Sequence, residues 1–153
     1  MTDPRQGGIA ILDYGSQYTQ LIARRVREQG VYAEVLPHNV TPDRLNLHQP
    51  RGVILSGGPN SIYEADAPQL PPFLVAGSLP LLGICYGMQA LTYALGGTVA
   101  AGTSREYGAA TITVSGENPL FHGMHHQLGV WMSHGDRIEQ PPPGFVGLAV
   151  SPG

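Results

Sequence analysis

The sequence predicts an α/β fold with a mostly parallel central sheet flanked by helices. Continuous apolar runs at 8–13 (GIAILD), 52–56 (GVILS) and 79–84 (LPLLGI) are typical of strands that are buried on both faces of a sheet. Segments with helix signals lie between these runs, as the crossover connections of a parallel sheet require. Because 42% of the 153 residues are hydrophobic, the chain can build one core of ordinary size.

Helix signals in the first half of the chain follow the strands in regular order. Ser16 is the expected N-cap of a helix that runs to about residue 28, and Gly30 closes it. Thr41 and Pro42 begin a short helix as its cap and its first residue. The other elements expected in this half are a strand at 31–36, a helix at 68–76 and a helix at 86–95.

After Gly97 the pattern changes from alternating strands and helices to short strands joined by turns. We expect these strands at 98–101, 109–115, 128–132 and 145–150, with one helical turn at 118–122. Successive strands without intervening helices predict a mixed or antiparallel extension of the sheet.

Charge and composition exclude several classes of protein. The net charge is only −3 and no basic stripe occurs, which argues against nucleic-acid binding. Residues 1–8 are polar, lack the apolar core of a signal peptide and are expected to be flexible. No apolar stretch is long and unbroken enough to span a membrane. We therefore expect a cytoplasmic protein with a single domain at 9–153.

The one cysteine, Cys85, is the first candidate for chemistry. Alone, it could be a small buried hydrophobic residue, and it excludes an intrachain disulfide and a zinc–thiolate cluster. Its surroundings favour catalysis, because an apolar run leads into G-x-C-x-G (Gly83 to Gly87) and then into a helix. This order matches the nucleophile elbow, with cysteine in place of serine. The sharp turn requires small residues two positions before and after the nucleophile.

A nucleophile elbow predicts how its neighbours act. The turn places Cys85 at the carboxyl edge of the sheet, where the sites of α/β proteins lie. The following helix begins there, and its N-terminus favours a thiolate. The backbone N–H of Tyr86 then points to where an oxyanion would form.

Two further loops follow predicted strands. Gly57 and Gly58, in the run SGGP, could bring a backbone N–H into the same site, although an ordinary Gly-Pro turn would use the same residues. Ser133 and His134 begin the run SHGD, where His134 could be a general base, a substrate contact or a surface residue. Other histidines at 122, 125 and 126 lack further residues at ligand spacing, so we expect no metal site.

The segments DYGSQY, SGGP, LGICYGMQ, REYG and WMSHGD together resemble one family, the glutaminase domains of GMP synthases. These are triad-type class I glutamine amidotransferases, which have a flavodoxin-like fold. The resemblance runs from about residue 9 to residue 138. It implies hydrolysis of glutamine to glutamate and ammonia without a cofactor in this domain. A synthetase (ATP-pyrophosphatase) domain or subunit would use the ammonia to convert XMP to GMP with ATP and magnesium.

The same resemblance implies roles for individual residues. Cys85 would be the nucleophile that forms a γ-glutamyl thioester. The N–H groups of Gly58 and Tyr86 would form the oxyanion hole. The residues expected to hold the glutamine head group are Gly57, Gln89, Ser133 and His134.

One part of the family pattern is absent from the sequence. In the family, a histidine in an H-x-E motif activates the cysteine, and no H-x-E occurs in these 153 residues. We expect the C-terminal part of the domain to be missing, as in a fragment or a split protein, and the chain to be poorly active. Self-association, for example as a homodimer, is also expected. The alternatives to a glutaminase are a cysteine hydrolase of the α/β-hydrolase or DJ-1-like type and a non-catalytic glutamine-binding or regulatory subunit.

Overall fold

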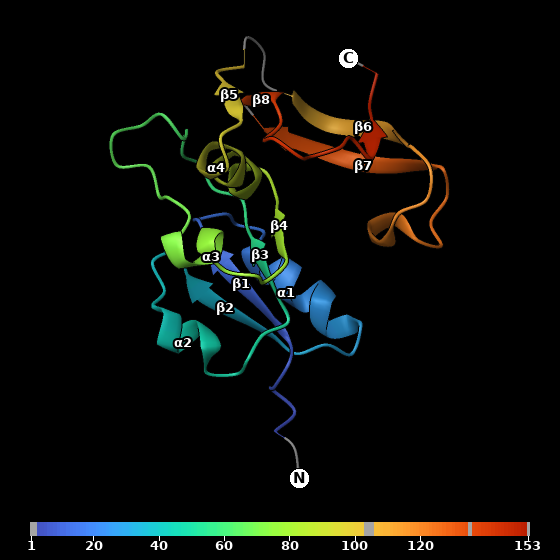
Figure 1. Cartoon of the computed structure of the whole chain (residues 1–153). Coiled ribbons are helices and arrows are strands. Elements are labelled where there is room, and N and C mark those ends of the chain that lie inside the picture. The colour runs from blue at the N-terminus through green and yellow to red at the C-terminus, as the bar shows by residue number, and fades with distance from the viewer. Residues whose placement is uncertain (1–2, 103–105, 135, 153) are drawn as a thin grey trace.

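The structure, a computed structural model, describes residues 3–102, 106–134 and 136–152. Figure 1 shows two parts: a layered α/β body made by the first half of the chain, and a separate antiparallel sheet beside it. The predicted fold class is confirmed by the first part. The two parts meet near the carboxyl ends of the parallel strands, where the predicted site residues lie.

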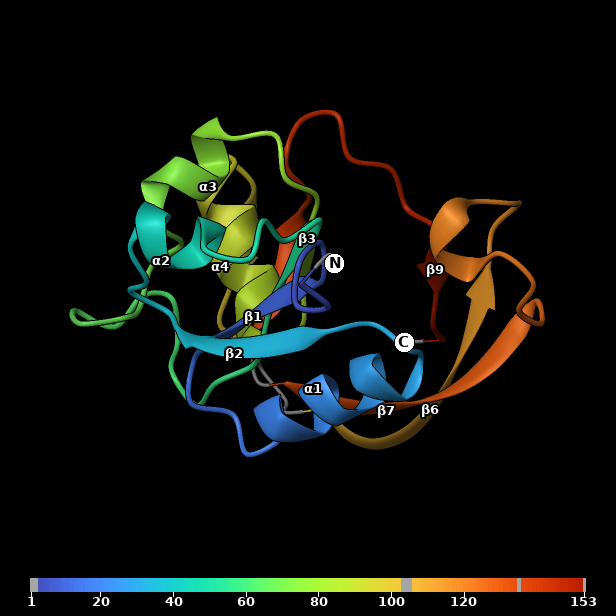
Figure 2. The ribbon, with the colours of Figure 1, turned by 90° about the horizontal axis from the view of Figure 1, so that it is seen from below.

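The body is built on a parallel sheet of four strands in the order β2-β1-β3-β4. The strands are β1 (Ile9–Asp13), β2 (Ala33–Pro37), β3 (Gly52–Leu55) and β4 (Leu81–Gly83). The helices of the body are α1 (Thr19–Glu28), α2 (Pro42–Asn46), α3 (Pro72–Ala76) and α4 (Tyr86–Ala94). Helix α1 lies on one face of the sheet, and the other three helices lie on the opposite face (Figures 1 and 2).

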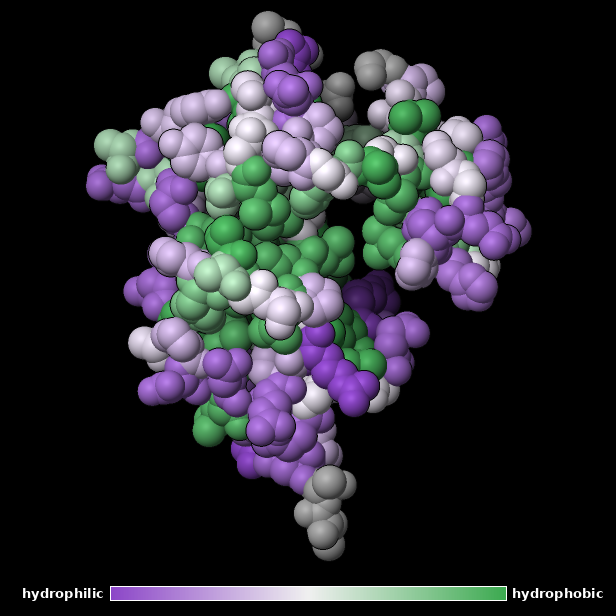
Figure 3. Space-filling model, in the orientation of Figure 1, coloured by the Kyte–Doolittle hydropathy of each residue, from purple (hydrophilic) through white to green (hydrophobic). Residues whose placement is uncertain are grey.

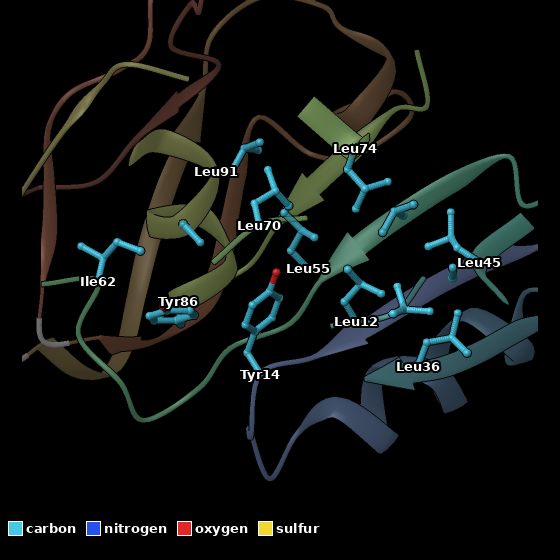
Figure 4. Packing of buried hydrophobic residues seen from close by; sticks show 14 of the residues in the cluster. Leu12, Tyr14, Leu36, Leu45, Leu55, Ile62, Leu70, Leu74, Tyr86 and Leu91 are labelled. Atoms are coloured by element: carbon cyan, nitrogen blue, oxygen red, sulfur yellow. The ribbon is translucent and has the colours of Figure 1, made fainter. Parts of the chain in front are cut away.

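Alternation along the strands divides the core between these two faces. Ala10 and Leu12 of β1 point to the face covered by α2, α3 and α4, and they join the larger hydrophobic cluster, part of which Figure 4 shows. Ile11, between them, points the other way and packs with Ala23 of α1. The apolar runs at 8–13 and 52–56 therefore correspond to strands covered on both faces, as predicted. The run at 79–84 differs from this prediction, because β4 lies at the edge of the sheet and is only partly buried.

The second half forms two small antiparallel sheets of its own. Strands β5 (Thr98–Ala100) and β8 (Arg137–Gln140) pair with each other. Strands β6 (Glu106–Val114), β7 (Gln127–His134) and β9 (Ala149–Val150) form a sheet in the order β7-β6-β9. A 3₁₀ turn at Pro119–Phe121 matches the helical turn expected there. The later strands are antiparallel, as expected, but as far as the structure describes them they form sheets separate from the central one.

Several element boundaries differ from the predicted ones. Helix α1 begins at Thr19, because Ser16 accepts a hydrogen bond from the N–H of Tyr18 in a separate turn. Helix α3 begins at Pro72 rather than at residue 68, since residues that precede prolines are biased towards extended backbone. Thr41 does cap α2, through a hydrogen bond from the N–H of Arg44. Strand β9 covers only the last two residues of the predicted strand at 145–150.

A hollow separates the α/β body from the β7-β6-β9 sheet, and Figure 3 shows hydrophobic residues on both of its sides. Strand β4 is the edge of the central sheet on this side, and its Leu82 is 40% exposed. Trp131, on β7, is 71% exposed. Exposed apolar side chains of this size are a feature of surfaces that bind another protein segment.

Candidate active site

The turn between β4 and α4 has the geometry of a nucleophile elbow. Cys85 has φ 51° and ψ −115°, a conformation that is strained for any residue other than glycine and that is typical of functional sites. A Cβ added at Gly83 would lie 2.6 Å from the Cα of Met88. A Cβ added at Gly87 would lie 2.2 Å from the carbonyl oxygen of Leu55. Close contact with neighbouring backbone atoms therefore explains why the elbow pattern needs small residues at Gly83 and Gly87.

The loop after β3 lies directly against the elbow. A Cβ added at Gly57 would be 3.3 Å from the Cβ of Cys85, so the loop backbone touches the cysteine side chain. A Cβ added at Gly58 would be 2.1 Å from the carbonyl oxygen of Tyr14. Within the described residues, the N–H groups of Gly58 and Tyr86 have no hydrogen-bond partner. Both donors therefore remain available to a bound group.

Cys85 opens into a pocket of about 730 Å³. The predicted site residues that line it are Gly57, Gly58, Cys85, Tyr86, Gln89 and Ser133. One predicted residue, His134, ends strand β7, but its side chain lies outside the described part of the structure. The fold thus brings together loops that follow β3, β4 and β7, which are far apart in the sequence.

Sequence reasoning missed part of the pocket wall. The missed lining residues come mainly from the β1–α1 turn and from the loop after Gly58: Gly15, Ser16, Gln17, Tyr18, Pro59, Asn60, Ser61, Glu64, Gly102, Tyr107 and Asp136. The position of the β1–α1 turn at the carboxyl end of a parallel strand was a signal that could have identified it. The contribution of Tyr107 depends on how the second sheet sits, which no local pattern reveals.

Gln89 and Ser61 fix the position of Asp136 at one side of the pocket. The side-chain amide of Gln89 donates to the carbonyl oxygen of Asp136 at 3.2 Å, and the Ser61 hydroxyl donates to its carboxylate at 2.7 Å. Glu64 also lines the pocket, and hydrogen bonds from Asn60 and Ser61 hold the pKa of its carboxyl below the ordinary value. The charged side chains among the described lining residues are thus both acidic.

Burial acts on the candidate nucleophile itself. The Cys85 side chain is partly buried, and this desolvation raises the pKa of its thiol above the ordinary value. The sequence pattern predicts that the N-terminus of α4 favours the thiolate. In the structure, partial burial of the thiol opposes this effect, because burial disfavours the charged thiolate.

Alkylation of Cys85 by iodoacetamide should therefore reach half of its limiting rate above about pH 8.5, the ordinary pKa of a thiol. Only the thiolate reacts, and a raised pKa moves its formation to higher pH. The rate is measured by intact mass from pH 6 to pH 10, with a small unstructured thiol peptide as the control. A midpoint clearly below that of the peptide would contradict the prediction.

The described residues contain no group of three or more His, Cys, Asp or Glu side chains that could hold a metal ion. The histidines at 122, 125 and 126 are exposed. Among the helices that the structure describes, none is long and apolar enough to cross a membrane.

The fold and the elbow define a class of α/β proteins that carry a cysteine on a sharp strand-to-helix turn at the carboxyl edge of a parallel sheet. Comparison with known families is more specific. The family model described as glutamine amidotransferase class-I matches residues 10–153. The chain belongs to this family.

Individual relatives are similar over nearly the whole chain. A GMP synthase [glutamine-hydrolyzing] of Thermomicrobium roseum is 53% identical over 150 residues, which are 98% of this chain and 28% of that protein. The corresponding protein of Nitratidesulfovibrio vulgaris is 54% identical over 143 residues, again 28% of its length. The chain therefore spans little more than a quarter of these curated relatives.

Solved structures support the same fold. A Thermoplasma acidophilum protein assigned as one subunit of a GMP synthase matches with a TM-score of 0.81 and 29% identity. That match covers 95% of this chain and 73% of the other. A glutamine amidotransferase of Thermotoga maritima matches with a TM-score of 0.67 at 24% identity, over 89% of this chain and 64% of the other, which shows the shared fold alone.

Proposed function

We propose that the chain is the glutaminase part of a GMP synthase and that it splits glutamine through a thioester on Cys85. The observation that carries the proposal is the elbow cysteine, which faces the Gly57–Gly58 loop inside a pocket of about 730 Å³. A pocket of this size accommodates an amino acid with room to spare. The family match and the GMP synthase relatives support the choice of glutamine as the substrate.

In the proposed reaction, the Cys85 thiolate attacks the side-chain amide carbon of glutamine. The amide oxygen becomes an oxyanion between the N–H groups of Gly58 and Tyr86. The carbon–nitrogen bond then breaks, and ammonia leaves after gaining a proton. Water hydrolyses the remaining γ-glutamyl thioester to glutamate and restores the thiol.

The remaining residues would hold the substrate in place. Gly57, Gln89, Ser133 and His134 are proposed to contact the glutamine head group, in part through backbone atoms. The carboxylates of Glu64 and Asp136 give the pocket a negative side that suits the α-ammonium group of an amino acid. Gln89 would also act indirectly, because its amide fixes Asp136.

Ammonia released here would pass to a synthetase partner, either a further domain or a separate subunit. That partner would bind ATP and magnesium and convert XMP to GMP, in the cytoplasm, as a step of purine biosynthesis. The length of the GMP synthase relatives, of which this chain matches 28%, supports a partner of this kind. We propose no cofactor for the glutaminase part itself.

Protection of Cys85 by substrate tests the glutamine site directly. Glutamine at millimolar concentration is expected to slow the alkylation of Cys85 by iodoacetamide at least fivefold, because a bound amide covers the thiol. Asparagine, one methylene shorter, is the matched control and should protect little. Equal rates with glutamine, with asparagine and with neither would refute a formed glutamine site. Protection without any acyl-enzyme would instead favour a non-catalytic binding subunit.

A further inference from the structure

Ser56 is a fully buried polar residue at the junction between β3 and the Gly57–Gly58 loop. Its hydroxyl oxygen accepts hydrogen bonds from the N–H of Tyr14 at 3.2 Å and from the Thr19 hydroxyl at 3.0 Å. It also donates to the carbonyl oxygen of Gly57 at 3.3 Å. One hydroxyl group thus connects the β1–α1 turn with the loop that faces Cys85.

Tyr14 extends this connection to both proposed oxyanion donors. Its carbonyl group contacts Gly58 so closely that a Cβ there would lie 2.1 Å from the oxygen. Its ring lies 5.4 Å from the ring of Tyr86, centroid to centroid, at an angle of 47°. Figure 4 shows the two rings side by side. Tyr14 therefore contacts both residues whose N–H groups are the proposed oxyanion donors.

We propose that Ser56 is a positioning residue, whose hydroxyl holds the Gly58 N–H in place relative to Cys85 and the Tyr86 N–H. The inference rests on the proposed function, since it concerns the oxyanion hole of that reaction. Adjacent glycines have the widest choice of backbone conformation, so Gly57 and Gly58 need an external anchor to keep one orientation. Donors stabilise an oxyanion strongly only when they are oriented before the reaction.

Two reactions of the same thiol separate positioning from simple folding. Acylation by a γ-glutamyl p-nitrophenyl ester passes through a tetrahedral oxyanion and needs the hole. Alkylation by iodoacetamide displaces iodide at a saturated carbon, forms no oxyanion and does not need it. The ratio of the two rates reports on the hole and cancels any change in the amount or ionisation of the thiol.

Ser56→Ala is expected to lower the ratio of acylation to alkylation by about tenfold or more, because loss of one oxyanion donor typically costs about 10²- to 10³-fold. Thr19→Val is the matched control. It removes a buried hydroxyl from the same network but leaves the hydrogen bond that Ser56 accepts from Tyr14 and the one that it donates to Gly57. Its ratio should stay within twofold of the original chain, even if its melting temperature falls.

The outcomes distinguish this inference from the proposed function. If Cys85 of the unchanged chain is not acylated by the ester, the proposed function itself fails. If it is acylated and Ser56→Ala keeps the ratio within twofold, the positioning role is refuted. If Ser56→Ala does not fold, Ser56→Cys carries the same comparison, because it keeps a small side chain with a weak donor. Peptide mapping then assigns each label to Cys85.

Discussion

Gly87→Ala is expected to destabilise the chain by about 3 kcal/mol, the upper part of the usual range for overpacking a core. The added Cβ would lie 2.2 Å from the carbonyl oxygen of Leu55 and 2.6 Å from its Cβ. Neither contact can be relieved by rotating a side chain, because the oxygen belongs to the backbone of β3 and Leu55 is fully buried. Helix α4 would have to move away from the sheet. Equilibrium denaturation with urea measures the loss.

A matched glycine controls for the general effect of adding a methyl group. Gly129, on β7, has no atom within 4 Å of the position that a Cβ would take, and its φ is not positive. Gly129→Ala should therefore change the free energy of unfolding by less than about 0.5 kcal/mol, as surface substitutions usually do. Equal losses for the two variants would mean that the close contact between α4 and β3 does not limit stability. Alkylation of Cys85 by iodoacetamide should be slower in Gly87→Ala but unchanged in Gly129→Ala.

Much of the α/β body could be predicted because its signals are local. The apolar runs predicted strands β1 and β3, and the expected cap at Thr41 predicted where α2 begins to within one residue. Strand β8 was missed, since its RIEQ sequence is polar and only pairing with β5 makes it a strand. Likewise, the apolar residues at 145–148 looked like strand, but of the segment 145–150 only Ala149 and Val150 pair with β6.

The candidate site could be predicted where chemistry and backbone geometry coincide in a short motif. Gly83, Cys85 and Gly87 form such a motif, because the elbow dictates small residues at fixed spacing. The roles of Ser56 and Asp136 depend on contacts between segments that are 37 and 75 residues apart in the chain. No spacing rule connects such segments, so only the folded arrangement shows that they meet.

Replacing Cys85 by alanine is expected to abolish the acyl-enzyme completely and to remove any glutamine hydrolysis that passes through the thioester, since the thiol forms that intermediate. The chain has one cysteine, so Cys85→Ala contains no other thiol that could form a thioester. Intact mass after exposure to the γ-glutamyl ester measures the acyl-enzyme, and released ammonia measures hydrolysis. Cys85→Ser is the conservative comparison, because a serine hydroxyl keeps the shape but is far less ionised.

In the unchanged chain, acylation of Cys85 by the ester should be readily measured, whereas release of ammonia from glutamine should be slow. p-Nitrophenolate leaves without a proton, so acylation by the ester should give about one equivalent of product in a burst. Expulsion of ammonia from glutamine needs a proton, and the sequence contains no H-x-E motif to supply and orient it. For a polypeptide of these 153 residues alone, we therefore expect glutamine turnover far below the typical enzyme rate of about 10 s⁻¹. Turnover near that rate, abolished in Cys85→Ala, would contradict this expectation and would leave His134 as the residue to test as the base.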